Sequence, residues 1–438
     1  MKLIFKRILN NSFLQDSFWA LLGNVIFRGA ALITSIMLAR ILQKTVFGEF
    51  NSLKNTLTTL AIFTTFGLGY SSTKFIADYI ILKKTNPKYL VRKIYTITLV
   101  FSGLISFLLY VFSSKISLLY YNSLTFSQEI KILSLWVLLT AVSTAQNGVI
   151  AGFGIFKKLT SVNIVMGLVT ILFLPVLAYY YGLTGACFAL LLIQAANAVL
   201  YFILIDKELK LLSTNSFKNI STHTEPAYKD ILIFSLPLTL IEAFFSLFLW
   251  LNYFLLQTYQ NYDEVALYAA AMQWYIVLLF IPTVLRNVIL SYFSKNDSAS
   301  KKQVLRNAVL ISFVTTLFPA LLLSFIAPYI SKMYGESFHG LTTVLRIVIF
   351  IPVFSSILNV LEQFLFSCSK NWIVFIICFT KDFLTFLIFF CVLYFWNVQH
   401  GAIYLTSAYL LMNVVTMVIY GLIYYRTDVF RQYLKSVN

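Results

Sequence analysis

Residues 17–39 have the sequence SFWALLGNVIFRGAALITSIMLA, a mostly apolar stretch with one positive charge, Arg28, near its middle. A helix of this length crosses the hydrocarbon layer of a bilayer, which is about 30 Å thick. An arginine at that depth costs roughly 2.5–3.5 kcal/mol on insertion scales, so a charge there usually marks a function within the membrane. The stretch therefore predicts a membrane-spanning helix whose arginine has a specific role.

The rest of the chain has the same character. Of its 438 residues, 60% are hydrophobic and 11% are charged, whereas a typical soluble domain has about 25% charged residues. Backbone polar groups inside lipid must pair within their own segment, which favours helices, and the alternating pattern of barrel strands is missing. The sequence predicts an all-α integral membrane protein with twelve spans, at 17–39, 46–70, 91–113, 131–152, 160–181, 183–205, 231–257, 266–293, 304–328, 341–366, 371–395 and 401–425.

Lysine and arginine residues are distributed unequally between the predicted loops. With the N-terminus inside, most of the 33 basic residues fall in cytoplasmic segments. The opposite loops hold only Lys44, Lys115, Lys131 and Lys332. Because cytoplasmic loops are enriched in Lys and Arg, both termini are predicted to be cytoplasmic. The net charge of +17 is then explained by contact with anionic lipid headgroups, and nucleic acid is not expected as a partner.

No pattern of catalytic or cofactor-binding residues stands out. Three of the four cysteines fall in predicted spans and Cys368 lies next to one; the four lack the spacing of metal ligands, and the three histidines are scattered over loops. Gly67-x-Gly69 lacks a third glycine and follows a membrane helix, which argues against a dinucleotide site. We therefore expect neither an enzyme nor a cofactor or metal.

The chain divides into two halves of six spans. A polar segment, residues 206–230, separates an N-terminal lobe (1–205) from a C-terminal lobe (231–438). A Gly-Ala pair opens the sixth span at Gly185 and the twelfth span at Gly401. Internal repeats of this kind are how many transporters build a central site between two bodies.

Polar side chains form helical rows in four of the predicted spans. Rows spaced by three and four residues turn one side of a helix toward water or protein. The rows are Asn24, Arg28 and Ser35; Asn51, Lys54, Asn55, Thr58 and Thr65; Ser235, Thr239, Glu242 and Ser246; and Thr283, Arg286 and Asn287. We expect a hydrated cavity bordered by spans one, two, seven and eight.

The predicted binding residues of this cavity are Arg28, Lys54, Arg286, Lys381, Asn24 and Asn55. Buried cations are suited to receive an anion that is too polar to cross the membrane alone. Lys381 adjoins Asp382 in the middle of a span, so an internal structural pair is an equal alternative for both residues. Glu242 either pairs with a cation, binds a coupling proton or ion, or neutralises the site; Asp382 is a second candidate for ion coupling or charge compensation.

Residues 21–50 and 63–79 resemble the first two helices of bacterial polysaccharide flippases. These are the O-antigen and capsule repeat-unit translocases of the multidrug/oligosaccharidyl-lipid/polysaccharide exporter superfamily. The residues that carry the resemblance are Leu38-Ala-Arg-Ile-Leu42, Phe47-Gly-Glu-Phe50 and Phe66-Gly-Leu-Gly69. Length, span count and the six-plus-six division extend the resemblance over the whole chain.

The resemblance implies a V-shaped, two-lobed bundle with a central cationic cavity in the inner membrane. The implied substrate is an undecaprenyl-diphosphate-linked oligosaccharide, which moves from the cytoplasmic to the outer leaflet by alternating access. The family's cavity cations map by position onto Arg28, Lys54 and Arg286. Further implied partners are membrane lipids and other polysaccharide-assembly proteins, and a monomer is expected because two lobes complete one cavity.

Other functions remain open. A drug exporter of the same superfamily should favour acidic residues, whereas this interior has more cations than acids. A lipid II flippase is closer in chemistry, but such relatives usually carry two further helices. A membrane polymerase or glycosyltransferase should show a large outer loop, and the largest outer segment here, near 114–130, is short. Proton or sodium coupling is equally open.

Overall fold

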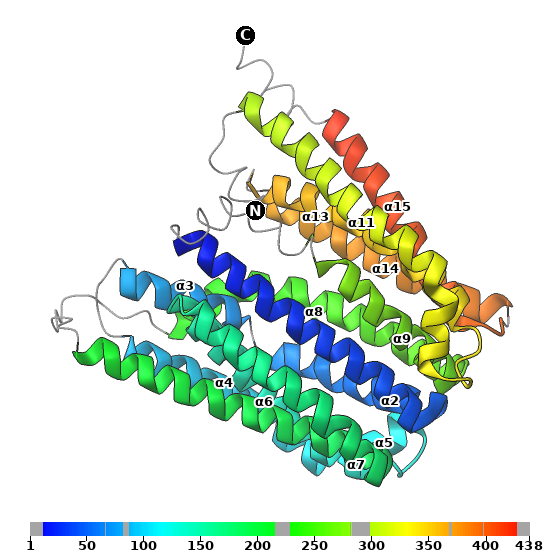
Figure 1. The fold of residues 1–438 in the computed structure, drawn as a ribbon, viewed down its shortest axis with the longest axis horizontal. Helices are drawn as coiled ribbons and strands as arrows, with labels where there is room; N and C mark the ends of the chain where they lie inside the picture. The colour runs from blue at the N-terminus through cyan, green and yellow to red at the C-terminus, as the bar shows by residue number, and fades with distance from the viewer. Residues whose placement is uncertain are drawn as a thin grey trace. The chain divides into compact units, whose positions relative to one another are not determined.

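The computed structural model describes residues 12–65, 67–81, 87–214, 228–280, 282, 298–367, 370–396 and 398–426. These residues form α-helices joined by short turns, and no β-strand occurs among them (Figure 1). The helices are α2 (Ser12–Thr65), α3 (Leu68–Ile81), α4 (Lys88–Val111), α5 (Ser113–Tyr121), α6 (Ser127–Gly152), α7 (Phe156–Thr214), α8 (Tyr228–Tyr259), α9 (Tyr262–Leu278), α11 (Ser298–Tyr334), α12 (Leu341–Val348), α13 (Ile351–Ser367), α14 (Asn371–Trp396) and α15 (Gly401–Arg426).

Eight helical stretches of the described residues are long and apolar enough to cross a membrane. Two of them, Val25–Thr65 in α2 and Phe156–Leu212 in α7, are each long enough to contain two predicted spans. Within each helix one residue with non-helical backbone marks a kink, Gln43 in α2 and Gly182 in α7. The backbone at Gly182 has a φ of 57°, a left-handed conformation that glycine adopts without steric cost. The prediction of an all-α integral membrane protein is confirmed.

Two short helices fall where the sequence predicts loops. The second span is predicted to continue to residue 70, but α2 ends at Thr65 and α3 begins at Leu68. The predicted loop between the second and third spans therefore contains most of α3. Similarly, α5 occupies part of the outer segment predicted near 114–130. Neither helix changes the number of long apolar spans.

The chain folds as two compact units. The first contains the residues up to Leu42 together with Leu53–Ser246, and the second contains Gln43–Ser52 together with the residues from Leu247 onward. In the first unit α6 packs against α3, α4 and α7, and Figure 1 shows α6 running alongside α4 and α7. Its core includes the fully buried side chains of Ile76, Leu90, Ile94, Val149 and Ile150. This packing holds the polar faces of α6 and α7 in place.

The second unit is built around α9, α13 and α15. The α9 residues from Glu264 to Ala271 are all buried, and α15 packs against α9, α12, α13 and α14. The segment Gln43–Ser52 joins this unit through specific contacts. The Thr45 hydroxyl donates a 2.6 Å hydrogen bond to Asp263 Oδ1, and the ring of Phe47 meets that of Phe338 edge to face with centroids 5.8 Å apart.

The Gly-Ala pairs that open the predicted sixth and twelfth spans have similar surroundings. In the first unit the hydroxyl of Thr184, just before Gly185, donates a 2.5 Å hydrogen bond to Glu129 Oε1. In the second unit the backbone N–H of Ala402 donates a 2.8 Å hydrogen bond to Glu264 Oε2. Both carboxylates are buried, at 5% and 6% exposure. A buried carboxylate therefore holds the chain next to each Gly-Ala pair, just after the kink of α7 in the first unit and at the start of α15 in the second.

Candidate functional site

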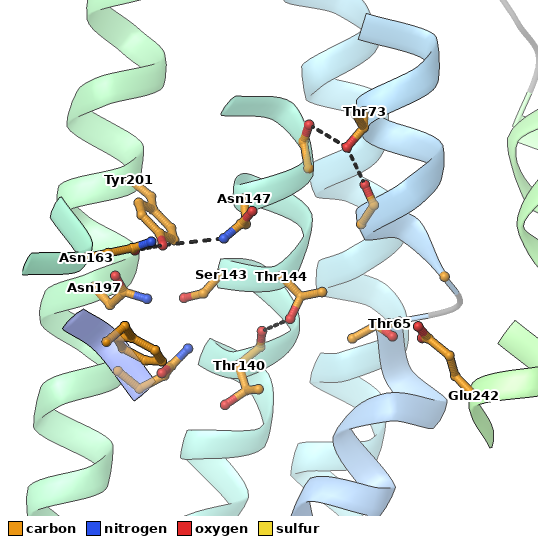
Figure 2. Close-up of a pocket in the computed structure, with 15 residues that line it drawn as sticks. Thr65, Thr73, Thr140, Ser143, Thr144, Asn147, Asn163, Asn197, Tyr201 and Glu242 are labelled. Atoms are coloured by element: carbon orange, nitrogen blue, oxygen red, sulfur yellow. Dashed lines mark hydrogen bonds between the residues drawn. The ribbon is translucent and has the colours of Figure 1, made fainter. Parts of the chain in front are cut away.

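A cavity of about 630 Å³ lies within the first unit. Ligand pockets in proteins are typically about 300–1,000 Å³, so its size suits a small molecule or part of a larger one. Helices α2, α3, α6, α7 and α8 all contribute to its wall (Figure 2). The polar lining comprises the side-chain amides of Asn147, Asn163, Gln194 and Asn197, the hydroxyls of Thr65, Thr73, Thr140, Ser143, Thr144 and Tyr201, and the carboxylate of Glu242.

The charge of this lining is low. Glu242 is the only acidic residue among the described residues that line the cavity, and none of them is a lysine or an arginine. Figure 2 shows its carboxylate next to Thr65, where α8 approaches the end of α2. The remaining polar groups are neutral and act both as donors and as acceptors. The cavity therefore offers hydrogen bonds to a polar, largely uncharged molecule.

Tyr201 connects the amides on the two sides of the cavity. Its hydroxyl donates a 2.9 Å hydrogen bond to Asn163 Oδ1, and the amide nitrogen of Asn147 donates to that hydroxyl at 3.5 Å (Figure 2). The side chain of Tyr201 is only 3% exposed. Asn163 and Tyr201 lie on opposite sides of the kink at Gly182, so the fold of α7 brings them together.

A very close approach of α3 and α6 forms another wall of the cavity. A Cβ atom on Gly148 would lie 2.1 Å from the carbonyl oxygen of Gly69. The hydroxyl of Thr73 joins the same two backbones, at 3.0 Å from the oxygen of Gly69 and 3.1 Å from that of Gly148 (Figure 2). The two glycines therefore allow the helices to bring Thr73 and Asn147 to one cavity.

Replacing Gly148 with alanine is expected to destabilise the first unit. The added methyl group clashes with backbone, which cannot swing aside, so the cost is at least the roughly 1–3 kcal/mol of ordinary overpacking. The melting temperature of the purified protein should fall by several degrees. Gly103→Ala is the matched control, because its Cβ meets nothing within 4 Å, and its melting temperature should not fall. Equal melting temperatures for both variants would contradict the close approach.

The residues predicted from the sequence fall in different places. Glu242 lines the cavity, and Arg28 is half-buried on α2 directly after Phe27, which also lines it. Lys54 and Asn55 are half-buried further along α2, and the amide nitrogen of Asn55 is buried without a hydrogen-bond partner in the described part of the chain. The side chain of Asn24 and the whole of Arg286 lie outside the described residues.

Lys381 and Asp382 form an ion pair in the second unit. The distance from Lys381 Nζ to Asp382 Oδ1 is 3.3 Å, and the two side chains are 13% and 9% exposed. The same ammonium group lies 5.7 Å from the centre of the Tyr409 ring on α15, and that ring packs edge to face against Tyr275 of α9. The pair is thus enclosed by three helices of its own unit; a role in substrate binding stays a prediction. Within the described ranges no three His, Cys, Asp or Glu side chains are grouped to hold a metal ion.

Sequence reasoning did not identify the amides of the cavity. Thr140, Ser143 and Asn147 are spaced by three and four residues on α6, and Gln194, Asn197 and Tyr201 are spaced in the same way on α7. These rows were a usable signal of a polar helix face. Rows that contain a charged residue are the stronger sequence signal, because the cost of a charge in a membrane is higher.

Comparisons with known proteins identify the family. Residues 13–297 match the model of a family described as polysaccharide biosynthesis protein. A curated relative, the EPS I polysaccharide export inner membrane protein EpsE of Ralstonia nicotianae, is 22% identical over 369 residues, which are 82% of either chain.

Solved structures identify the fold. An inward-facing multidrug resistance MATE family transporter of the MOP superfamily matches with a TM-score of 0.77 and 13% identity, over 92% of this chain and 95% of that chain. An outward-facing transporter of the same description has a TM-score of 0.67 and 15% identity, over 96% of each chain. A MOP superfamily transporter from Pyrococcus furiosus has a TM-score of 0.68 and 14% identity, over 94% of each chain.

The family model covers well over half of the chain, which confirms the resemblance seen in residues 21–50 and 63–79. The protein therefore belongs to the polysaccharide biosynthesis protein family and has the fold of MOP superfamily transporters.

Proposed function

We propose that the protein is a flippase that moves an undecaprenyl-diphosphate-linked oligosaccharide from the cytoplasmic to the outer leaflet of the inner membrane. The observation that carries the proposal is the cavity of amides and hydroxyls within a unit made of membrane-spanning helices. Polar side chains inside a membrane protein are costly unless they form hydrogen bonds with a polar partner such as a ligand. The family, and a relative named for polysaccharide export, support a sugar as that cargo.

The energetics of the cargo explain why such a lining is needed. Each hydroxyl or amide that enters hydrocarbon without a partner costs several kcal/mol, and a diphosphate costs far more. Side-chain amides and hydroxyls replace the hydrogen bonds that a sugar gives up when it leaves water. The polyprenyl tail needs no such help, because it stays in the lipid throughout.

The diphosphate requires cations, and the candidates are Arg28, Lys54, Arg286 and Lys381, with Asn24 and Asn55 as neutral donors. An arginine engages phosphate oxygens with two parallel hydrogen bonds, whereas a lysine acts as a point charge. Arg28 is the strongest candidate. It follows a residue of the cavity wall on α2, and it lies near the centre of a span.

Alternating access is the expected mechanism, because transporters of this fold occur in inward-facing and outward-facing conformations. An inside-negative potential favours export of an anion by about 2.3 kcal/mol per charge per 100 mV. Two substrate charges can therefore drive export alone. If a proton or sodium ion is coupled, Glu242 and Asp382 are the residues that bind it.

One observation favours a multidrug exporter as the second candidate. Glu242 carries the one full charge among the described lining residues, and a carboxylate attracts organic cations. Drug sites, however, are lined mainly by apolar and aromatic side chains, whereas four amides and six hydroxyls line this cavity. The lining therefore fits a sugar better.

The test is the leaflet distribution of lipid-linked oligosaccharide in cells that lack the protein. Build-up on the cytoplasmic side, relieved by wild type but not by Arg28→Ala at matched abundance, is the expected result. Arg40→Ala is the control on the same helix, because Arg40 is exposed and should restore flipping. A normal distribution in a strain without a second flippase would overturn the proposal, and efflux of organic cations from the same cells would then support the exporter.

A further inference from the structure

The hydrogen bonds of Tyr201 orient two cavity amides in opposite senses. Asn163 uses its oxygen to accept from Tyr201, so its amide nitrogen is left to donate. Asn147 uses its nitrogen to donate to Tyr201, so its oxygen is left to accept. The cavity thus presents a donor, the amide nitrogen of Asn163, on one side of the buried Tyr201 hydroxyl. On the other side it presents an acceptor, the amide oxygen of Asn147 (Figure 2).

This arrangement complements an amide group of a ligand. An acylamino group has a carbonyl oxygen that needs a donor and an N–H that needs an acceptor. A plain hydroxyl needs neither in a fixed position, because it rotates to suit its partner. A fixed donor and a fixed acceptor, held by a residue that is 3% exposed, therefore favour a sugar with an acylamino substituent over one with hydroxyls alone.

Two hydroxyls of the lining have no partner within the described structure. Ser143 Oγ and Thr140 Oγ1 are buried atoms without a hydrogen bond, and the side chain of Ser143 is only 4% exposed. Nearly all buried polar atoms in native proteins are paired, with protein or with an ordered molecule. Both residues line the cavity, and their buried hydroxyls add to the polar character of its wall.

The charge of the lining sets a second limit on the ligand. None of the described lining residues is a lysine or an arginine, and the carboxylate of Glu242 repels anions. An anion that enters such a site gives up its hydration without gaining a partner charge. The lining therefore disfavours acidic sugars, and the diphosphate is expected to lie beside the cavity, where Arg28 follows Phe27.

We propose that the cavity of the first unit is a selectivity site for an uncharged sugar that carries an acylamino group, with Tyr201 as its positioning residue. This inference rests on the proposed function, because it takes the cargo to be an oligosaccharide. It assigns the sugar to one unit of the chain and separates it from the diphosphate. Glycans whose lipid-linked sugar is N-acylated are then flipped in preference to glycans of acidic or plain sugars.

The test uses full-length protein in lipid nanodiscs and three disaccharides with the same linkage. These are N,N′-diacetylchitobiose, cellobiose and cellobiouronic acid, and their dissociation constants come from NMR titration of the sugar signals. We expect the diacetylated sugar to bind roughly tenfold or more tightly than cellobiose, since it alone supplies both hydrogen-bonding partners. Cellobiouronic acid should bind more weakly than either.

Variants separate positioning from general stability. Tyr201→Phe keeps the ring and should reduce the preference for the diacetylated sugar to nearly one. Asn147→Ala should do the same, and it keeps the test available if Tyr201→Phe does not fold, because Asn147 is exposed. Tyr95→Phe is the control: Tyr95 accepts a 3.0 Å hydrogen bond from Gln146 outside the cavity lining, and its removal should leave the preference unchanged.

Any other result of the titrations shows which part of the proposal is wrong. Equal binding of the diacetylated sugar and cellobiose, or strong binding of the acidic sugar, would overturn the assigned ligand class. No binding of any of the three would overturn the cavity as the sugar site. The leaflet assay then decides how far the failure extends: normal flipping by the same wild-type protein keeps the proposed function, whereas absent flipping removes it as well.

Discussion

Replacing Lys381 with methionine is expected to lower the free energy of unfolding by about 3–5 kcal/mol, because it leaves a buried carboxylate without its partner. The distance from Lys381 Nζ to Asp382 Oδ1 is 3.3 Å, and the Asp382 side chain is only 9% exposed. Methionine has a similar length and an apolar stem, so the change removes charge and little volume. The melting temperature and the amount of protein in the membrane should both fall.

The double variant Lys381→Met, Asp382→Asn shows whether the charges matter as a pair. Removing both members of a buried ion pair is often neutral, whereas removing one is strongly destabilising. The double variant should therefore recover most of the lost stability. A double variant as unstable as the single one would mean that Lys381 stabilises the unit by some other contact, such as the one with Tyr409.

The same double variant separates the two roles predicted for Lys381. If the pair is purely structural, the stable double variant restores the leaflet distribution of lipid-linked oligosaccharide. If Lys381 also binds the anionic substrate, the double variant is stable but does not restore flipping. Stability and transport thus give independent answers from one protein.

The helices were predictable because the local amino-acid composition identifies membrane-spanning segments. A span must be apolar over about 20 residues, and most predicted stretches lie within one long helix where the structure describes them, although the stretch 341–366 is divided between α12 and α13. The continuity of α2 through Gln43 and of α7 through Gly182 was not predictable. A single residue of non-helical backbone separates the spans there, and hydropathy does not register one residue.

The candidate site was only partly predictable, for a physical reason. A charged residue within a span has a high free-energy cost, so Glu242 is recognisable as a candidate from the sequence. Uncharged amides cost much less, so Asn147 and Asn163 did not stand out among the other polar residues of their spans. Tyr201 becomes the link between them only after α7 bends and brings positions 163 and 201 together at 2.9 Å.

The predicted internal repeat shows the same limit, because its sequence signal is local. The sequence signal was the Gly-Ala pair at Gly185 and Gly401; the first pair lies just after the kink of α7, and the second lies at the start of α15. The groups that fix these positions are Glu129 and Glu264, which come from other helices. Partners that are distant in sequence are set by packing, so a local motif shows where a constraint acts without showing its source.

Replacing Gly48 with alanine is expected to have the second large effect, a loss of folded protein from the membrane. A Cβ atom at this position would lie 1.9 Å from the carbonyl oxygen of Tyr262 and 2.7 Å from its carbonyl carbon. Real Cβ atoms essentially never come within 3.0 Å of a heavy atom outside their own and neighbouring residues. The backbone of α2 or α9 must therefore move. The cost should exceed the roughly 1–3 kcal/mol of ordinary overpacking, and abundance and melting temperature should both drop sharply.

Gly29→Ala on the same helix is the matched control, because its Cβ meets nothing within 4 Å, and it should remain near wild-type abundance. A stable Gly48→Ala protein would show that the contact with Tyr262 is not as close as described. The expected result also gives the Phe47-Gly-Glu-Phe50 motif a physical meaning. Phe47 packs against Phe338 while Gly48 admits the backbone of Tyr262. This part of the family resemblance then reflects how Gln43–Ser52 is held in the second unit.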